Sequence, residues 1–159
     1  MNRAFVFPGQ GSQVVGMGQE LAEAFPAAKL VFEEVDDALE TRLSRIIFDG
    51  PQEELTLTQN AQPALMAVSM AVVRVLEAEG GVKIGDVATF VAGHSLGEYS
   101  ALAAAGAIPL AETARLLRTR GEAMQAAVPV GVGAMAAILG PSLEAVEAIA
   151  ADAAEDQVC

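Results

Sequence analysis

Gly93-His94-Ser95-Leu96-Gly97 is a Gly-x-Ser-x-Gly pentapeptide that lies between an apolar run, Ala88–Ala92, and a helix-forming segment, Glu98–Ala105. This order of strand, sharp turn and helix is typical of a nucleophile elbow, which lifts a serine hydroxyl clear of the backbone and faces it to a helix N-terminus. Small residues on both sides of the serine are a steric requirement of such a turn. The alternative is an ordinary tight strand-to-helix turn that happens to contain a serine.

The composition indicates a compact globular protein and excludes several classes of function. The chain has 159 residues, of which 53% are hydrophobic and 19% charged, and a formal net charge of -12. With nine Lys and Arg in all, it lacks the clustered cations that nucleic acid binding requires. One cysteine, Cys159, and one histidine, His94, exclude an internal disulfide, a cysteine-based metal site and a multi-histidine zinc site.

No membrane span or secretory signal is predicted. The apolar run Ala64–Val73 is closed by Arg74, and Ala101–Leu110 contains Pro109. Only four apolar residues of the N-terminus precede Pro8, too few for the core of a secretory signal. We therefore expect a cytoplasmic protein with neither a membrane nor a nucleic acid as partner.

The elements predicted along the chain alternate between strand and helix. Ala4–Phe7 is expected to be a buried strand, followed by the glycine-rich loop Gly9–Gln13 and a helical stretch near Gly18–Ala24. Asp49-Gly50-Pro51 breaks the chain. Further helices are predicted over residues 27–40, 63–76 and 111–127, the second beginning with Pro63 in its first turn. This alternation predicts the α/β class with a mainly parallel sheet.

The pattern changes after Pro129, where a second, smaller unit is predicted to begin. Gly133–Gly140 resembles a strand, and Ser142 is suited to cap a helix over Leu143–Ala154. We therefore predict a large domain over residues 1–128 and an incomplete small one over residues 129–159. Only three convincing strands are present, whereas a parallel sheet buried on both faces usually has more, so the fold is expected to continue beyond residue 159.

Attack by a serine on an acyl group requires a base, an oxyanion hole and a pocket. The backbone N–H of Leu96, at the helix N-terminus, is one oxyanion donor, and the loop Gly9-Gln10-Gly11 is the candidate for the second. His94 is disfavoured as the base because neighbouring side chains at a strand end point to opposite sides. A packing role that supports the elbow is favoured for it.

Three arginines lie within six residues. Arg115 and Arg118 share one helix face, which is either a solvated face or a docking surface. Arg120 is turned well away from Arg115 and precedes Gly121. Its guanidinium fork is suited to holding a substrate carboxylate through two parallel hydrogen bonds.

With these residues assembled, the chain closely resembles the N-terminal half of the malonyl-CoA:acyl carrier protein transacylases, from residue 3 to its end. The segments that carry the resemblance are Phe5–Gln13, Thr58–Leu65, Gly93–Tyr99, Arg120-Gly121 and Gly133–Ile138. Their order and spacing make the resemblance highly specific.

The resemblance implies catalytic roles for three residues. Ser95 would be the acylated nucleophile, and the backbone amides of Gln10 and Leu96 would form the oxyanion hole. It also implies a substrate-binding set, in which Arg120 binds the free carboxylate of the malonyl group.

The same set includes two pocket residues. Gln62 matches a glutamine that lines the family's active site. Met124 falls where the family has a pocket residue after the arginine.

The implied fold is a large α/β-hydrolase-like subdomain with a parallel sheet, together with the start of a ferredoxin-like small subdomain. The implied reaction is ping-pong transfer in fatty acid biosynthesis: malonyl passes from coenzyme A to Ser95, then to the phosphopantetheine thiol of acyl carrier protein. Coenzyme A and phosphopantetheine are substrate carriers, so no metal or tightly held cofactor is implied, and the complete protein is expected to be a monomer.

One departure from the family is that its catalytic histidine lies well downstream of the serine, and this sequence ends before reaching it. We therefore expect a fragment of a protein of about twice the length, with negligible turnover on its own. Two other functions stay open. One is a serine esterase or thioesterase with the same elbow and water as the acceptor. The other is a non-catalytic fragment that binds the acidic carrier protein through Arg115 and Arg118.

Overall fold

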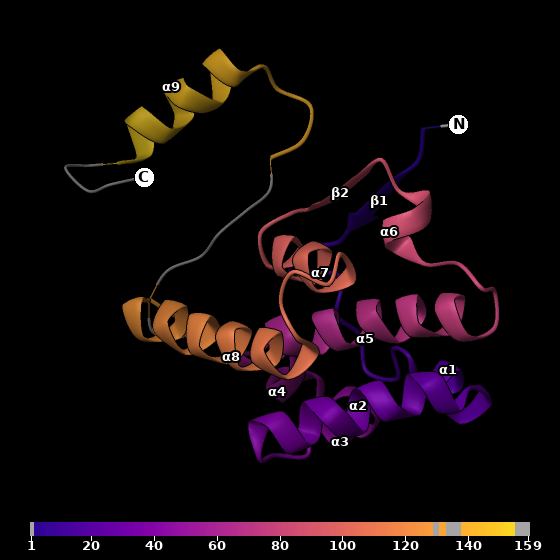
Figure 1. Ribbon diagram of the computed structural model, residues 1–159. Helices are drawn as coiled ribbons and strands as arrows, with labels where there is room; N and C mark the ends of the chain where they lie inside the picture. Colours follow the sequence, from indigo (N-terminus) through magenta and orange to yellow (C-terminus); the bar gives the residue numbers. More distant parts are fainter. Residues whose placement is uncertain (1, 129–130, 133–137, 155–159) are drawn as a thin grey trace. The chain divides into compact units, whose positions relative to one another are not determined.

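The structure of the protein, a computed structural model, describes residues 2–128, 131–132 and 138–154 (Figure 1). The chain divides into two compact units, Met1–Val128 and Pro129–Cys159. The first unit contains the sheet and eight helices among its described residues. Its elements are β1 (Ala4–Phe7), α1 (Gln19–Ala24), α2 (Pro26–Leu39), α3 (Leu43–Asp49), α4 (Gln52–Thr56), α5 (Thr58–Ala78), α6 (Ile84–Val87), β2 (Phe90–Gly93), α7 (Leu96–Ala104) and α8 (Leu110–Ala127).

The two strands pair in parallel, which confirms the α/β class and the parallel sheet. The register runs from Ala4 opposite Phe90 to Phe7 opposite Gly93. Because side chains alternate along a strand, one face carries the partly buried Phe5 and the buried Phe7, and the other leaves Val6 74% and Phe90 68% exposed. Helix α7 contacts both strands, and Phe5 and Phe7 line one pocket with Leu65 and Val68 of α5. The carboxyl ends of both strands lie side by side, which brings the Gly9 loop next to Ser95.

Helix α5 is the centre of the first unit, with α2, α7 and α8 packed against it (Figure 1). Its buried residues extend from Asn60 to Val73 and include Met66 and Ala67, both without solvent exposure. Leu117 of α8 and Val35 of α2 belong to the same core. Burial of these apolar surfaces, at about 25 cal/mol per Å², is the main stabilising contribution.

Helix α5 also corrects the prediction about membrane spans. Among the described residues, α5 is the one helix that is long enough and apolar enough to cross a membrane. It has 21 residues and a mean hydropathy of 1.3 over its most apolar window. The expectation that Arg74 disqualifies this segment was therefore wrong by length and composition. However, 56% of that window is buried inside the protein, because three helices cover it. Its apolar character is accounted for by its place in the core.

The N-terminal boundary of α5 was predicted five residues too late. Pro63 lies inside the helix, which begins at Thr58. The segment Thr58–Gln62 is polar and does not show an apolar period, but its side chains bond to other elements and hold it helical. Three short helices, α3, α4 and α6, were not predicted, because helices of four to seven residues are too short to show a full apolar period.

The second unit contains α9 (Leu143–Ala153) among its described residues. Its N-cap is Ser142, whose Oγ accepts a hydrogen bond from the backbone N–H of Ala145 at 3.4 Å, which confirms the predicted capped helix. Residues 133–137 of the predicted strand Gly133–Gly140 lie outside the described residues, as does Cys159, and residues 138–140 are not in a strand. The ferredoxin-like assignment stays a prediction.

Ser100 in α7 gives a test of the packing. Its Oγ is buried and has no hydrogen-bond partner among the described residues, whereas the Oγ1 of buried Thr113 in α8 donates to the Pro109 carbonyl at 2.9 Å. A buried hydroxyl without a partner is a net cost, so Ser100→Ala in the full gene product should leave stability unchanged or raise it by up to about 1 kcal/mol. The matched control Thr113→Val should lower it by about 1 kcal/mol. Urea unfolding midpoints measure both, and a loss for Ser100→Ala as large as that for Thr113→Val would contradict the assignment.

Candidate active site

The turn between β2 and α7 holds Ser95 in an uncommon backbone conformation. Strand β2 ends at Gly93 and α7 begins at Leu96, so His94 and Ser95 make the whole connection. Ser95 has φ 55° and ψ -113°, a positive φ that non-glycine residues rarely adopt. Such strain persists only where the surrounding structure fixes it, and it is concentrated at functional sites. The geometry is that of a nucleophile elbow.

The two glycines of the pentapeptide are required by the close approach of backbone to backbone. A Cβ on Gly93 would overlap the backbone of Gly97, and a Cβ on Gly97 would lie 2.5 Å from the carbonyl oxygen of Phe7. Neither obstacle is a flexible side chain that could move aside. The steric requirement inferred from the sequence is confirmed.

The glycine-rich loop after β1 lies against the elbow. The backbone N–H of His94 donates to the Phe7 carbonyl at 3.3 Å, and a Cβ on Gly9 would overlap the His94 ring. The exposed His94 side chain therefore packs against this loop, which is the supporting role favoured for it. In the described part of the chain, the backbone N–H groups of Gln10 and Leu96 donate to no protein acceptor. Neither amide is thus engaged within the part of the protein that the structure describes.

Arg120 of α8 contacts Ser95 directly. Its Nη2 donates to Ser95 Oγ at 3.1 Å, and its Nη1 donates to Gln62 Oε1 at 2.6 Å. The guanidinium carbon also lies 6.0 Å from the centre of the Tyr99 ring, at the edge of cation–π range. Helices α5 and α7 and the turn between β2 and α7 thus each contribute a group that contacts this arginine.

Gln62 of α5 is fully buried and connects Arg120 to Met124. Its Oε1 accepts from Arg120, and its Nε2 lies 3.3 Å from Met124 Sδ, a weak acceptor. The structure therefore places Ser95, Arg120, Gln62 and Met124 in one continuous cluster. The Gln10 side chain joins the same region, since its Nε2 donates to Thr58 Oγ1 at 3.3 Å.

The charge of Arg120 is not neutralised by the groups that hold it. Gln62 and Ser95 are neutral, and Tyr99 contributes a ring face. The ion pairs found among the described residues join Lys29 to Glu33 and Arg74 to Glu77, both far from this helix in sequence. A guanidinium that is oriented but uncompensated, next to a serine hydroxyl, is a site for an anionic group.

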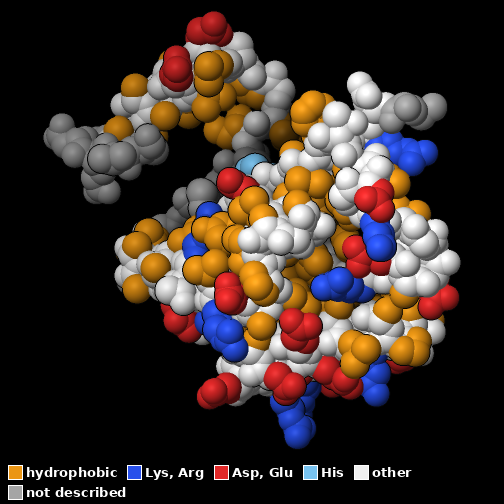
Figure 2. Space-filling view, viewed as in Figure 1, with side chains coloured by type: hydrophobic (Ala, Val, Ile, Leu, Met, Phe, Trp, Pro, Cys, Tyr) orange, Lys and Arg blue, Asp and Glu red, His pale blue; other side chains and the backbone are white. Residues whose placement is uncertain are grey.

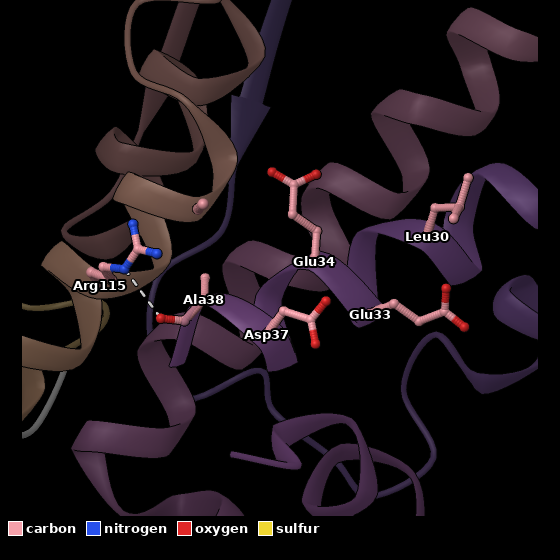
Figure 3. A pocket seen from close by; sticks show the side chains of 7 residues that line it. Leu30, Glu33, Glu34, Asp37, Ala38 and Arg115 are labelled. Atoms are coloured by element: carbon pink, nitrogen blue, oxygen red, sulfur yellow. Dashed lines mark hydrogen bonds between the residues drawn. The ribbon is translucent and has the colours of Figure 1, made fainter. Parts of the chain in front are cut away.

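Arg115 has a partner inside the protein. Its Nε donates to the Ala38 carbonyl at 3.1 Å, in the last turn of α2, beside a groove that Glu34 and Asp37 also line (Figure 3). A basic side chain at the end of a helix satisfies a carbonyl that has no partner within the helix. Figure 2, which has the same viewpoint as Figure 1, shows acidic side chains along its lower edge. Figure 1 places α2 and α3 at this edge.

Arg118 also has an internal partner, because its Nη1 donates to Asn60 Oδ1 at 2.7 Å. Partial burial lowers the pKa of its guanidinium, and Glu122 opposes that shift. Arg115 and Arg118 are thus both engaged within the fold. This disfavours the hypothesis that the two arginines form a free docking face for an acidic partner.

Sequence reasoning gave no role to Thr58, Asn60 and Tyr99, although all three lie in the segments that carry the family resemblance. The available signal was their position: each is within four residues of a residue that was singled out. Side-chain partners more than 40 residues apart, such as Asn60 and Arg118, were beyond inference from one sequence.

Gly121 sets the distance between α8 and α5, and its substitution tests the site's geometry. A Cβ there would lie 2.5 Å from Gln59 Cα and 2.7 Å from the Thr58 carbonyl oxygen, which are backbone atoms. Gly121→Ala should therefore push the helices apart and lower stability by about 1–3 kcal/mol. Gly85→Ala in α6, where no atom lies within 4 Å of the new Cβ, is the matched control and should be neutral. Equal thermal unfolding midpoints for the two variants would contradict the close contact.

Comparison with known proteins places the chain among acyl transferases. The family model described as "Acyl transferase domain" matches residues 4–159. The chain is 56% identical over 146 residues to the malonyl CoA-acyl carrier protein transacylase of Bacillus subtilis, covering 92% of this chain and 44% of that protein. It is 47% identical over 155 residues to the protein of the same name from Escherichia coli K12, covering 98% of this chain and 49% of that protein. The chain thus spans about half the length of the curated relatives it matches.

Solved structures give the same result. The acyl-carrier-protein-S-malonyltransferase from Bartonella henselae matches with a TM-score of 0.93 and 62% identity, over 100% of this chain and 50% of that one. A malonyl-transacylase in complex with its type II PKS acyl-carrier protein matches with a TM-score of 0.90 and 44% identity, over 99% of this chain and 50% of that one.

Proposed function

The chain belongs to the acyl transferase family, and from this premise we propose that it forms part of a malonyl-CoA:acyl carrier protein transacylase. In this function Ser95 takes the malonyl group from coenzyme A as an ester and passes it to the phosphopantetheine thiol of acyl carrier protein. The names of the relatives in Bacillus subtilis and Escherichia coli support this activity, and the complex of a relative with its acyl-carrier protein supports the partner.

The observation that carries the proposal is the 3.1 Å hydrogen bond between Arg120 Nη2 and Ser95 Oγ. In a malonyl group, one methylene carbon separates the free carboxylate from the reacting carbonyl. A cation within hydrogen-bond reach of the nucleophile therefore suits an acyl group that is both short and anionic at its far end. When the carboxylate binds, it takes over the Arg120 Nη2 donor that held Ser95 Oγ, while the bond from Arg120 to Gln62 stays. Binding of the correct substrate therefore frees the nucleophile.

The reaction needs stabilisation of the tetrahedral intermediate. We assign this role to the backbone amides of Gln10 and Leu96, which donate to no protein acceptor among the described residues. Leu96 is also the first residue of α7, whose dipole favours negative charge there. Gln62 orients Arg120, and Met124 lines the acyl pocket.

The proton of Ser95 must be removed when the acyl group is attacked. The side chain found in contact with Ser95 Oγ is Arg120, which donates and cannot act as a base at neutral pH. His94 packs against the Gly9 loop instead. We therefore assign the base to a group outside the described residues.

The rest of the proposal follows the family. The protein would act in fatty acid biosynthesis in the cytoplasm as a monomer, with coenzyme A and phosphopantetheine as carriers and no further cofactor. The first unit would be the N-terminal part of an α/β-hydrolase-like subdomain, and the second unit the start of a ferredoxin-like one. A serine esterase or thioesterase is disfavoured, because a simple ester offers no carboxylate to Arg120.

A mass measurement tests the proposed acyl-enzyme. The full gene product that carries this sequence is incubated with malonyl-CoA, and its intact mass is followed by a peptide map. We expect one malonyl adduct, on the peptide that contains Ser95, and none in Ser95→Ala. An adduct that persists in Ser95→Ala, or none in the unchanged protein, would contradict the assignment of the nucleophile.

Substitution of Arg120 tests the choice of substrate. Arg120→Ala should lower malonyl transfer by about 10- to 100-fold, the effect of losing a hydrogen bond to a charged group, while acetyl transfer is retained or rises. The matched control is Arg115→Ala, on the same helix but bonded to α2, which should leave the ratio of the two rates unchanged. Rates of transfer from malonyl-CoA and acetyl-CoA measure this, and an equal loss for both substrates would refute the carboxylate site.

A further inference from the structure

Two arginine–amide hydrogen bonds join α8 to α5. Arg118 Nη1 donates to Asn60 Oδ1 at 2.7 Å, and Arg120 Nη1 donates to Gln62 Oε1 at 2.6 Å. The two donor residues are two positions apart on α8, and the two acceptor residues are two positions apart on α5. Two positions correspond to about 200° around a helix. The two bonds therefore lie on different sides of both helices. Each bond opposes a rotation of α8 about its axis in the direction that the other bond does not restrain.

The backbone contact at Gly121 lies between these two bonds. The direction of Gly121 on α8 is about 60° from that of Arg118 and about 100° from that of Arg120. At this point the α8 backbone approaches Gln59 and Thr58 so closely that a Cβ would meet backbone atoms at 2.5 Å and 2.7 Å. Gly121 thus acts as a pivot, about which α8 could turn if one of the two hydrogen bonds were lost.

Asn60 is held more firmly than a surface residue would be. It is buried, with 6% of its surface exposed, and its Nδ2 donates to the Glu54 carbonyl at 2.8 Å. This second bond fixes the orientation of the amide, because only the nitrogen can donate to a carbonyl. Oδ1 is therefore directed to Arg118, and the position needs both a donor and an acceptor.

Rotation of α8 about its axis would move the guanidinium of Arg120 relative to Ser95. Arg120 reaches Ser95 across from α8, whereas Ser95 itself is fixed by the β2–α7 turn. The distance between Arg120 and Ser95 consequently depends on the angle of α8 about its own axis. Among the described residues, the hydrogen-bond partner of Arg118 is Asn60 and not Ser95, so we expect its effect on the reaction to pass through the angle of α8 and hence through Arg120.

We propose that the Asn60–Arg118 hydrogen bond is a positioning pair that sets the angle of α8 and thereby aims Arg120 at the carboxylate of the acyl group bound at Ser95. Asn60 and Arg118 are thus residues that determine specificity without touching the substrate. This inference rests on the proposed function, since it names further residues that act on the same site.

Two substitutions each break the Asn60–Arg118 hydrogen bond, one by removing the acceptor and one by removing the donor. The ratio of malonyl to acetyl transfer measures the result. Asn60→Leu removes the acceptor at similar size, and Arg118→Met removes the donors but keeps an apolar stem. Each should lower the ratio by about tenfold, which is 1.4 kcal/mol, because Arg120 is no longer aimed at the carboxylate. Asn60→Asp keeps an oxygen acceptor for Arg118 but loses the donor to the Glu54 carbonyl, so it should lower the ratio less than Asn60→Leu does. Arg115→Met is the matched control, since it removes a hydrogen bond from α8 to α2 and should leave the ratio unchanged.

The measurement is made in the full gene product, and unfolding midpoints are recorded beside the rates. A purely structural role would lower the midpoint and reduce both transfers together, leaving the ratio as it was; that result would overturn the proposal. If Asn60→Leu does not fold, Arg118→Met decides the question alone, because its side chain is only half-buried. Absence of a malonyl adduct on Ser95 in the unchanged protein would be a failure of the proposed function itself, and it is observed before any variant is made.

Discussion

The backbone conformation of Ser95 is the constraint on which the rest of the site depends. A positive φ at a residue with a Cβ is costly, and it is held here by β2 on one side and α7 on the other. Those elements can meet at so sharp an angle only because Gly93 and Gly97 have no side chains to collide. Gly97 in turn packs against the carbonyl oxygens at the end of β1, which places the Gln10 loop beside the serine. One tight turn thus positions Ser95, the helix N-terminus and the neighbouring loop relative to one another.

The chemistry of the site follows from the neutrality of the groups around Arg120. A carboxylate partner would have held the guanidinium equally well but would have cancelled its charge. Gln62, buried and fixed by Arg120 and Met124, orients the arginine and leaves the charge for a ligand. The hydrogen bond to Ser95 Oγ places that charge next to the serine hydroxyl, where the proposed function puts the carboxylate of a short acyl group. In the proposed function, specificity for an acyl group with a carboxylate and activation of the serine would be parts of a single arrangement.

Local signals in the sequence predicted the elements that contain the chemistry. The run Ala4–Phe7 was assigned as a strand with its exact bounds, and the elbow, α2, α8 and the Ser142 cap were also recognised, because each depends on short-range periodicity or on a turn residue. The start of α5 was misplaced because Thr58–Gln62 is helical through contacts with α4, α8 and the Gln10 loop, which no local pattern shows. Arg120 was singled out by its direction on the helix, yet its bond to Gln62 joins residues 58 apart and required the fold. The roles assigned to the site residues stay predictions.

A crystal structure of the acyl-enzyme, obtained from the full gene product treated with malonyl-CoA, tests the central claim most directly. The account predicts a malonyl ester on Ser95 Oγ, with its carboxylate bound to the guanidinium of Arg120 and its carbonyl oxygen facing the amides of Gln10 and Leu96. Arg120 would no longer donate to Ser95 Oγ and would keep its bond to Gln62. A malonyl ester whose carboxylate points away from Arg120, or whose carbonyl oxygen faces neither amide, would contradict the account.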